Sequence, residues 1–210
     1  MPSPEDHGKR SQILEAAARV FARDGFARAT IKHIAAEAGL SAPALIYWYF
    51  KDKYDLFQSV LVETSLVLTE IKPDAPGADS MPRETLLHLA SRFIATFQQP
   101  HVGQLFRIFM AEATRDEQVS RRFETSTIQP VQSYLTSYLQ HQVDLGRLRP
   151  HDCQAAARAL VGSLLIYVLS HELFVSVQPE LDANDPYLAT VIDIFLHGLQ
   201  SSNPAEGEVS

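Results

Sequence analysis

The stretch Thr30 to Lys53, TIKHIAAEAGLSAPALIYWYFKDK, decides the fold of this chain because it predicts two short helices joined by a tight turn. The hydroxyl of Thr30 can accept a backbone N–H and so cap a first helix that carries Ile34. Gly39 suits the left-handed conformation in which helices end, and Leu40 supplies the apolar contact that usually follows. The first helix is therefore expected to stop at Gly39.

A second short helix is expected to begin after Ser41, whose hydroxyl can cap it. Pro43 fits the first turn, where a missing N–H costs nothing, and Ala44 favours helix. Two helices across such a turn form a helix-turn-helix, in which the second helix can enter the major groove of DNA. The stretch therefore predicts a DNA-reading module.

The preceding segment, Lys9 to Asp24, carries apolar residues at helical spacing along one face. Gly25 ends this helix, and Phe26 is expected to fold back on Phe21. The three helices together would make a small head in which the first helix braces the other two.

These elements together resemble the TetR family of transcriptional regulators over about residues 9 to 57. The shared marks are FARDGFARAT, TIKHIAAEAGLS and YWYFKDKYDLF. The spacing from Gly39 to Phe50 departs from the family pattern by one additional residue, near Ala42 to Leu45. Two alternatives therefore stay open for the residues at the bases, which are either Pro43 and Ala44 or Ala44 and Leu45.

The resemblance implies where the head would touch DNA. Lys53 matches the family's phosphate-binding lysine, and its charge next to a helix N-terminus explains why an anion would bind there. Either Trp48 or Phe50 packs in the core instead of facing DNA, and for Arg28 and Lys32 simple surface solvation is an equal alternative. The expected DNA-binding residues are Arg28, Thr30, Lys32, Ser41, Pro43, Ala44, Tyr47, Trp48, Tyr49 and Lys53.

The charge is divided unevenly along the chain. The whole chain has a net charge of −7, but residues 9 to 53 hold eight Lys and Arg against four Asp and Glu, so this part is +4 and the remainder is −11. Phosphate attraction acts locally, so a basic head suffices for DNA binding while an acidic body discourages non-specific docking.

The rest of the chain predicts an all-α body, since no alternating strand pattern and no repeat occurs in it. We expect a flexible N-terminus at 1–8, a helix-turn-helix domain at 9–53, a helical ligand-binding and dimerisation domain at 54–200 and a loose tail at 201–210. Pro130 should kink or divide one helix of the body. The expected helices cover 51–71, 83–98, 102–116, 119–145, 152–177 and 186–200, with a loop at 73–81.

The last two expected helices carry apolar stripes that could pair with a second copy of the chain across a two-fold axis. Family members usually dimerise through these helices, and the alternative is that the stripes are internal core. The expected interface residues are Leu160, Leu164, Val168, Val191, Ile194, Phe195 and Leu199.

The middle helices carry bulky apolar groups with a few polar tips, a mixture suited to a pocket for a small apolar or amphipathic effector. Ordinary core packing, including a satisfied core histidine, is the competing interpretation. The candidate pocket residues are Phe93, Phe97, Phe106, Phe109, Met110, Tyr134, Tyr138, Tyr167 and His171.

Enzymatic and metal chemistry find no support in the sequence. The eight histidines are never three to five residues apart, so no local two-histidine metal site exists, and no phosphate-binding glycine loop or nucleophile elbow occurs. Cys153 is the only cysteine, which excludes an internal disulfide. We expect no catalytic residue, no metal and no cofactor.

The sequence also shows no apolar signal segment, and the stretch Leu160 to Leu169 looks too short to span a bilayer, so we expect a cytoplasmic protein without a membrane partner. The function expected is a ligand-responsive repressor that binds a palindromic double-stranded DNA operator as a homodimer. The alternatives are a constitutive regulator or activator without an effector and, with less support, an all-α enzyme.

Overall fold

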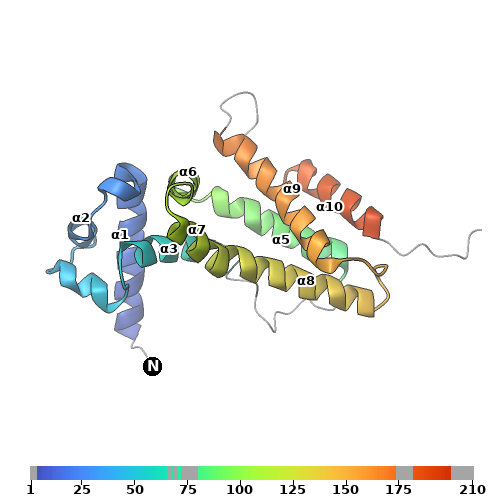
Figure 1. The fold of residues 1–210 in the computed structure, drawn as a ribbon, viewed down its shortest axis with the longest axis horizontal. Helices are drawn as coiled ribbons and strands as arrows, with labels where there is room; N and C mark the ends of the chain where they lie inside the picture. The colour runs from blue at the N-terminus through green and yellow to red at the C-terminus, as the bar shows by residue number, and fades with distance from the viewer. Residues whose placement is uncertain (1–3, 66–67, 69–70, 72–79, 174–181, 200–210) are drawn as a thin grey trace, which may run out of the picture. The chain divides into compact units, whose positions relative to one another are not determined.

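The structure is a computed structural model that describes residues 4–65, 68, 71, 80–173 and 182–199 (Figure 1). No strand occurs in this part of the chain, so the expected all-α class is confirmed. The helical elements are α1 (Pro4–Arg28), α2 (Ile31–Glu37), the 3-10 helix η1 (Pro43–Trp48), α3 (Lys53–Thr64), α5 (Pro82–Phe97), α6 (Val102–Ala113), α7 (Glu117–Phe123), the π-helical turn η2 (Glu124–Ile128), α8 (Gln129–Asp144), α9 (Cys153–Leu173) and α10 (Pro186–Leu199).

The chain divides into two compact units by its internal contacts. The head unit comprises Met1–Ser65 and Thr96–Thr127, and the bundle unit comprises Leu66–Ala95 and Ile128–Ser210. The head unit thus holds α6 and α7 together with α1, α2, η1 and α3, while α8, α9, α10 and most of α5 make the bundle unit. Two helices of the expected body therefore pack with the DNA-reading head.

An aromatic cluster forms the core of the head unit. Gly25 has φ +77°, and this break lets Phe26 fold back on Phe21, with ring centroids 5.8 Å apart, as expected. Phe57 of α3 lies 5.0 Å from Phe21 and 5.1 Å from Phe26. All three rings are buried. Because buried aromatic rings dominate core energetics, this cluster fastens α3 to α1.

Helix α3 begins at Lys53 and ends at Thr64, so the helix expected at 51–71 is interrupted at Ser65, and Leu68 is helical again. The hydroxyl of Thr64 donates to the carbonyls of Val60 and Leu61, and the amide of Ser65 donates back to Val62. The side-chain amide of Gln99 donates to the carbonyl of Thr64 at 2.7 Å. These bonds satisfy the carbonyls of Val60, Leu61, Val62 and Thr64 at the end of α3. Residues 66–67 and 69–70 lie outside the described residues.

The segment expected as one helix over 119–145 is divided near Pro130, as predicted. Helix α7 ends at Phe123, the π-helical turn follows, and α8 starts at Gln129 with Pro130 in its first turn. A proline costs nothing there, because the first N–H groups of a helix have no intrahelical partner.

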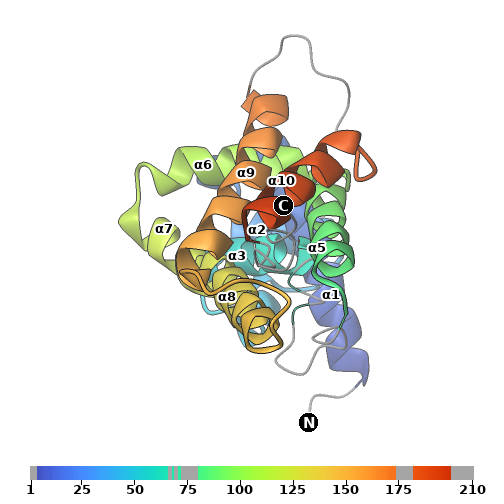
Figure 2. The same ribbon diagram turned by 90° about the vertical axis from the view of Figure 1, so that its right-hand side faces the viewer.

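In the bundle unit, α8 lies alongside α9 and α10 packs on α9, in both views (Figures 1 and 2). Arg149 caps the end of α10, because its guanidinium donates to the carbonyl of Gly198 at 2.8 and 3.0 Å and its amide donates to that of Leu199. Helices α5 and α10 match the expected ranges closely. Most of the expected loop at 73–81, residues 174–177 and the expected tail at 201–210 lie outside the described residues.

One described helix, Cys153–Glu172, is long and apolar enough to cross a bilayer by length and composition alone. The core helix of a globular protein passes the same test, and Ala157, Leu160, Leu164 and Val168 of this helix are buried inside the chain. The apolar stretch is thus longer than Leu160 to Leu169 suggested.

Candidate nucleic-acid interface

The turn between α2 and η1 follows the sequence expectation closely. Thr30 is the N-cap of α2, and its hydroxyl accepts from the amide of His33 at 3.1 Å. Gly39 has φ +64°, and the amide of Leu40 donates to the carbonyl of Ala35 at 2.9 Å. The Thr30 cap and the helix stop at Gly39 are therefore confirmed. Both were predictable because each depends on residues that are neighbours in sequence.

The reading element differs from expectation. Its N-cap is Ala42 and not Ser41, no side chain caps it, and it winds as a 3-10 helix from Pro43 to Trp48. The expected Ser41 cap is therefore wrong: Pro43 occupies the first helical position, which makes Ala42, without a hydroxyl, the preceding residue. A 3-10 helix has three residues per turn and poorer hydrogen-bond geometry than an α-helix.

Two buried anchors hold the reading element in the head. Ile46 is fully buried and Phe50 is 2% exposed, whereas Trp48 is 79% and Tyr47 55% exposed. Of the two alternatives for the core aromatic, Phe50 is the one that packs inside. Tyr47 and Trp48 project from the element between these anchors and offer their rings to solvent.

Early in η1, Pro43 and Ala44 are exposed while Leu45 is partly buried. This exposure favours Pro43 and Ala44 over Ala44 and Leu45 as the side chains at the bases. Ser41 is exposed in the turn and Tyr49 is partly buried. Their contacts with DNA stay predictions.

Helix α1 braces the reading unit through a contact that sequence reasoning missed. The side-chain amide of Gln12 donates to the carbonyl of Ala38, at the end of α2, at 2.8 Å. The two residues are 26 positions apart, so no local sequence pattern predicts this bond. It satisfies a carbonyl that the end of a helix leaves without a partner.

The basic residues from Arg19 to Lys53 fall into two groups. Arg19 and Arg23 pair with Glu37 at 2.9 and 3.4 Å, and their hydrogen bonds hold the pKa of Glu37 below its usual value. Arg23 also pairs with Asp24. Arg28, Lys32 and Lys51 are exposed and Lys53 is partly so. These four residues are named the basic rim, and their contact with phosphate stays a prediction.

The start of α3 is fixed by two carboxylates. Asp52 accepts from the amide of Asp55 at 2.7 Å, and Asp55 accepts from the amide of Lys51 at 2.7 Å, a reciprocal cap. Burial opposes ionisation of Asp52, but the bond from Asp55 and the guanidinium of Arg122, 3.4 Å away, hold its pKa below the usual value. The Asp-x-x-Asp spacing was a readable signal for this cap.

Lys53 has a structural role in the absence of DNA. Its ammonium donates to the carbonyls of Phe26 at 2.8 Å and Ala29 at 3.0 Å and lies 4.4 Å from the ring centroid of Phe26. Burial lowers the pKa of Lys53, and the charge of Glu112 opposes this. An ammonium has three donors, so one remains for an outside acceptor such as phosphate.

Helix α7 is tied to the start of α3. The hydroxyl of Tyr54 donates to Asp116 at 2.9 Å, and the amide of Gln58 donates to the carbonyl of Arg122 at 3.5 Å. Asp116 also caps α7 by accepting from Gln118, and these bonds lower its pKa, the backbone bond contributing most. Sequence reasoning missed this link, because Tyr54 and Asp116 are 62 residues apart.

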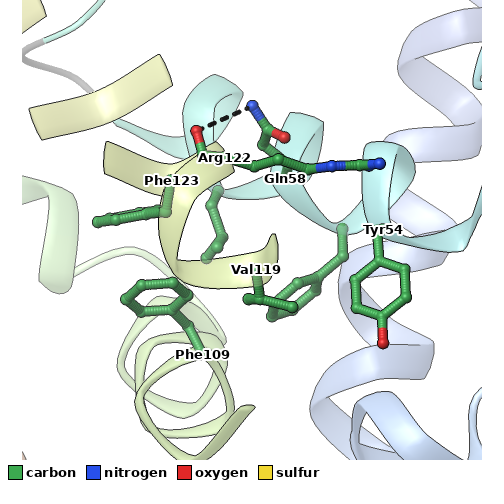
Figure 3. A pocket seen from close by; sticks show the side chains of 8 residues that line it. Tyr54, Gln58, Phe109, Val119, Arg122 and Phe123 are labelled. Carbon is green, nitrogen blue, oxygen red and sulfur yellow. Dashed lines mark hydrogen bonds between the residues drawn. The ribbon is translucent and has the colours of Figure 1, made fainter. Parts of the chain in front are cut away.

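A small cavity lies between α3, α6 and α7 within the head unit (Figure 3). Its volume of about 10 Å³ is room for one water-sized body. The rings of Phe109 and Phe123, 4.0 Å apart, stand on one side (Figure 3). The lining residues are Tyr54, Phe57, Gln58, Leu61, Phe109, Val119, Arg122 and Phe123.

The nine candidate pocket residues are divided between the two units. Phe97, Phe106, Phe109 and Met110 belong to the head unit, where Phe97 and Phe106 meet edge to face at 5.3 Å. Of the nine, Phe109 alone lines the described cavity.

The remaining five, Phe93, Tyr134, Tyr138, Tyr167 and His171, belong to the bundle unit. There Tyr167 donates to Asp185, stacks on Tyr187 at 4.6 Å and lies 4.5 Å from His171. His171 bonds the carbonyl of Tyr167 through Nδ1 at 2.8 Å. Tyr167 and His171 therefore have partners of their own within the bundle unit.

The candidate dimer residues differ in exposure. Leu160, Leu164 and Val168 are buried within one chain, which leaves them little surface to offer a partner. Ile194 is 69% exposed, and Val191, Phe195 and Leu199 are partly exposed. The helical face of α9 that reaches solvent is instead marked by Ile166, 56% exposed. The spacing of apolar residues along α9 and α10 predicts an apolar stripe, but it does not show whether that stripe faces the core or the solvent.

Within the described residues, no group of three or more His, Cys, Asp or Glu side chains could hold a metal ion. A helix-turn-helix with an exposed reading element and a basic rim defines the class of a DNA-binding transcriptional regulator.

The family comparisons identify both parts of the chain. Residues 13–60 match the family of bacterial regulatory proteins, tetR family, and residues 84–198 match the AefR-like transcriptional repressor, C-terminal domain. The chain belongs to the TetR family of transcriptional regulators, which are DNA-binding proteins and not enzymes.

Individual relatives agree over nearly the whole length. The chain is 25% identical to the HTH-type transcriptional regulator AcrR of Shigella flexneri over 207 residues, 95% of this chain and 94% of AcrR. Its fold is similar to that of Salmonella enterica GusR, with a TM-score of 0.72 and 22% identity over 95% of this chain and 98% of GusR. Its fold is also similar to that of Bacillus subtilis FadR, solved in complex with stearoyl-CoA, with a TM-score of 0.70. The identity is 19% over 90% of this chain and 99% of FadR.

The role of Lys53 leads to a prediction about stability without DNA. Lys53→Met keeps most of the apolar stem and removes the ammonium, which leaves two carbonyls short of a donor and should lower the free energy of unfolding by about 1 kcal/mol. The matched change Lys51→Met, at an exposed lysine two residues earlier, should stay within about 0.5 kcal/mol. Urea denaturation of the three proteins measures both. Equal stability of the Lys53 and Lys51 variants would contradict the structural role.

Proposed function

We propose that this regulator is a homodimeric repressor that binds a palindromic operator and releases it when an effector binds. The observation that carries DNA reading is the exposed face of η1 flanked by the basic rim of Arg28, Lys32, Lys51 and Lys53. A single helix-turn-helix reads one half-site, and two-fold pairing matches the symmetry of a palindrome. The description of the matched C-terminal family as a transcriptional repressor supports the sign of control.

DNA selection tests the operator proposal. The purified full-length protein, incubated with a random-sequence DNA pool at two salt concentrations, should enrich a palindromic motif whose half-sites are about one helical turn, or a multiple of it, apart. Affinity should fall steeply with salt, because rim cations release condensed counterions. Lys32→Ala should weaken binding on every sequence alike and, because it removes one phosphate contact from each subunit of the dimer, flatten the salt slope by about two units. Failure to enrich any motif would contradict operator binding by the free protein.

The dimer is proposed to form through α9 and α10. Ile166 and Ile194 are large apolar side chains that are more than half exposed in the single chain. In a two-fold interface each residue is buried twice, once from each subunit, so its contribution doubles. The exposed faces of α9 and α10 are therefore the surface proposed for the partner copy, with Leu160, Leu164 and Val168 supporting it from inside.

Ile194→Asp should weaken the dimer at least about 100-fold, because it buries a charge and loses an apolar side chain on both sides of the interface. Met81→Asp is the matched control, since Met81 is 58% exposed at the start of α5, in the same unit. Sedimentation or light scattering across a concentration series measures both variants. A dimer constant unchanged by Ile194→Asp would place the interface elsewhere.

The effector is proposed to be a small apolar or amphipathic molecule that separates α6 and α7 from α3. The cavity between these helices is apolar but holds only about 10 Å³, far below the several hundred Å³ of ligand pockets. An effector of ordinary size would therefore bind only an opened form. This gives the differential affinity for two states that any ligand-driven shift requires.

Opening at this place would reach the DNA-reading end of the head. Tyr54 and Asp52, which hold α7 through Asp116 and Arg122, flank Lys53 at the start of α3. Moving α7 away from α3 would break these contacts next to the basic rim. The complex of FadR with stearoyl-CoA supports effector binding within this fold, although it does not name the effector here.

Thermal unfolding with a panel of apolar and amphipathic compounds, stearoyl-CoA among them, tests the effector. A true effector at 100 times its dissociation constant should stabilise the protein by about 2.7 kcal/mol. Val119→Phe, which fills the cavity, should reduce that stabilisation, whereas Val161→Phe on α9, in the bundle unit, should not. Stabilisation that is the same in both variants would place the effector elsewhere. The absence of any stabilising compound would favour a constitutive regulator.

A cytoplasmic location without a membrane partner belongs to the same proposal. Its target is DNA, and the apolar helix α9 has one side buried in the chain at Ala157, Leu160 and Leu164. That burial supports a core helix and not a membrane span.

A further inference from the structure

The reading element carries no side chain of the kind that identifies bases by paired hydrogen bonds. Residues 38 to 50, AGLSAPALIYWYF, include no Arg, Lys, Asn, Gln, Asp, Glu or His. Recognition of guanine by paired bonds uses Arg or Lys, recognition of adenine uses Asn or Gln, and recognition of cytosine uses Asp or Glu. None of these pairings is available from this turn and helix.

What η1 exposes is mostly apolar. Pro43 and Ala44 are exposed at its start, and Tyr47 and Trp48 expose 55% and 79% of their surface near its end. The hydroxyls of Ser41 and Tyr47 and the indole N–H of Trp48 offer single hydrogen bonds. Single bonds discriminate bases poorly, whereas the 5-methyl group of thymine is the one apolar feature in the major groove.

The charged side chains surround this element without belonging to it. Arg28 ends α1, Lys32 lies on α2, Lys53 begins α3, and Lys51 lies two residues before it. Contacts of such cations with phosphate fix register and strength but carry no sequence information. Strength and choice of sequence are therefore assigned to different residues.

We infer that each half-site is chosen through thymine methyl groups that pack against Pro43 and Ala44, and not through hydrogen bonds to guanine. This inference rests on the proposed operator binding and adds the chemistry by which the operator is recognised. Burying one methyl contributes enough to change affinity about fourfold. A change made in both half-sites of a palindrome should therefore change affinity about 15-fold.

The experiment uses the full-length protein and the operator recovered by selection. Each thymine is replaced by deoxyuridine, which removes only the methyl group, and each guanine by 7-deazaguanine, which removes the N7 acceptor. At one or two positions per half-site, uridine in both halves should lower affinity about 15-fold, while 7-deazaguanine should change it less than about twofold. This series uses the unaltered protein, so folding of a variant does not enter.

A variant pair then locates the methyl contact on the protein. Ala44→Gly removes the methyl group on the protein side. Uridine at the contacted position should therefore lower the affinity of this variant for the operator less than about twofold. Ala36→Gly is the control, because Ala36 is also an exposed alanine of the helix-turn-helix and lies on α2. In that control the uridine effect should persist, since changes at separate sites add.

The outcomes separate this inference from the function on which it rests. If an operator is selected, but no uridine lowers affinity and 7-deazaguanine costs tenfold or more, the methyl inference is overturned and the operator-binding regulator stands. If uridine costs the same in Ala44→Gly as in the unaltered protein, the contact is not at Ala44 and the inference is overturned in its residue assignment. If selection recovers no operator, both are overturned.

Discussion

The attachment of α3 to the end of α1 is the constraint on which the rest of the head depends. Phe26 stands at the centre of it, because its ring packs on Phe21 and Phe57 while its carbonyl accepts a bond from Lys53. The same ring lies beneath the Lys53 ammonium and 4.6 Å from Tyr54. One residue thus joins the aromatic core to the charged edge, and Gly25 makes this possible by turning the chain.

The DNA-reading element depends on the rest of the head for its stability. Helix α2 and η1 are short, and helices of this length are not stable alone. They are held by α1 through Gln12 on one side and by the buried Ile46 and Phe50 on the other. Helices α6 and α7 belong to the same compact unit and pack on α1 and α3, the helices that precede and follow this assembly in the chain.

The sequence predicted well what neighbouring residues determine. The Thr30 cap, the stop at Gly39 and Leu40 and the division near Pro130 each depend on a few adjacent residues. It failed where a short element competes with its surroundings. The Ser41 cap and the length of α3 depended on details of hydrogen bonding, at Ala42 and between Gln99 and Thr64, that propensity does not contain.

Features that depend on distant residues could not be predicted from periodicity. The spacing of Leu160, Leu164 and Val168 showed that they share a face of a helix, but only the structure shows that this face is internal. The bonds from Tyr54 to Asp116 and from Gln12 to Ala38 join residues 62 and 26 positions apart. The sequence predicts Lys53 as a phosphate contact, which stays a prediction, and it gives no sign of the two bonds of Lys53 to the carbonyls of Phe26 and Ala29.

The absence of charge from residues 38 to 50 has a consequence for how such a regulator can change. In the proposed binding mode the rim cations carry the ionic attraction to DNA, so replacing Pro43, Ala44 or Tyr47 would leave the number of displaced counterions the same. The preferred DNA sequence could then change through substitutions of small apolar residues, while the overall affinity for DNA and its salt dependence stay the same. Under this proposal a new DNA target would require changes only at the exposed face of η1, with neither a new fold nor a new balance of charge.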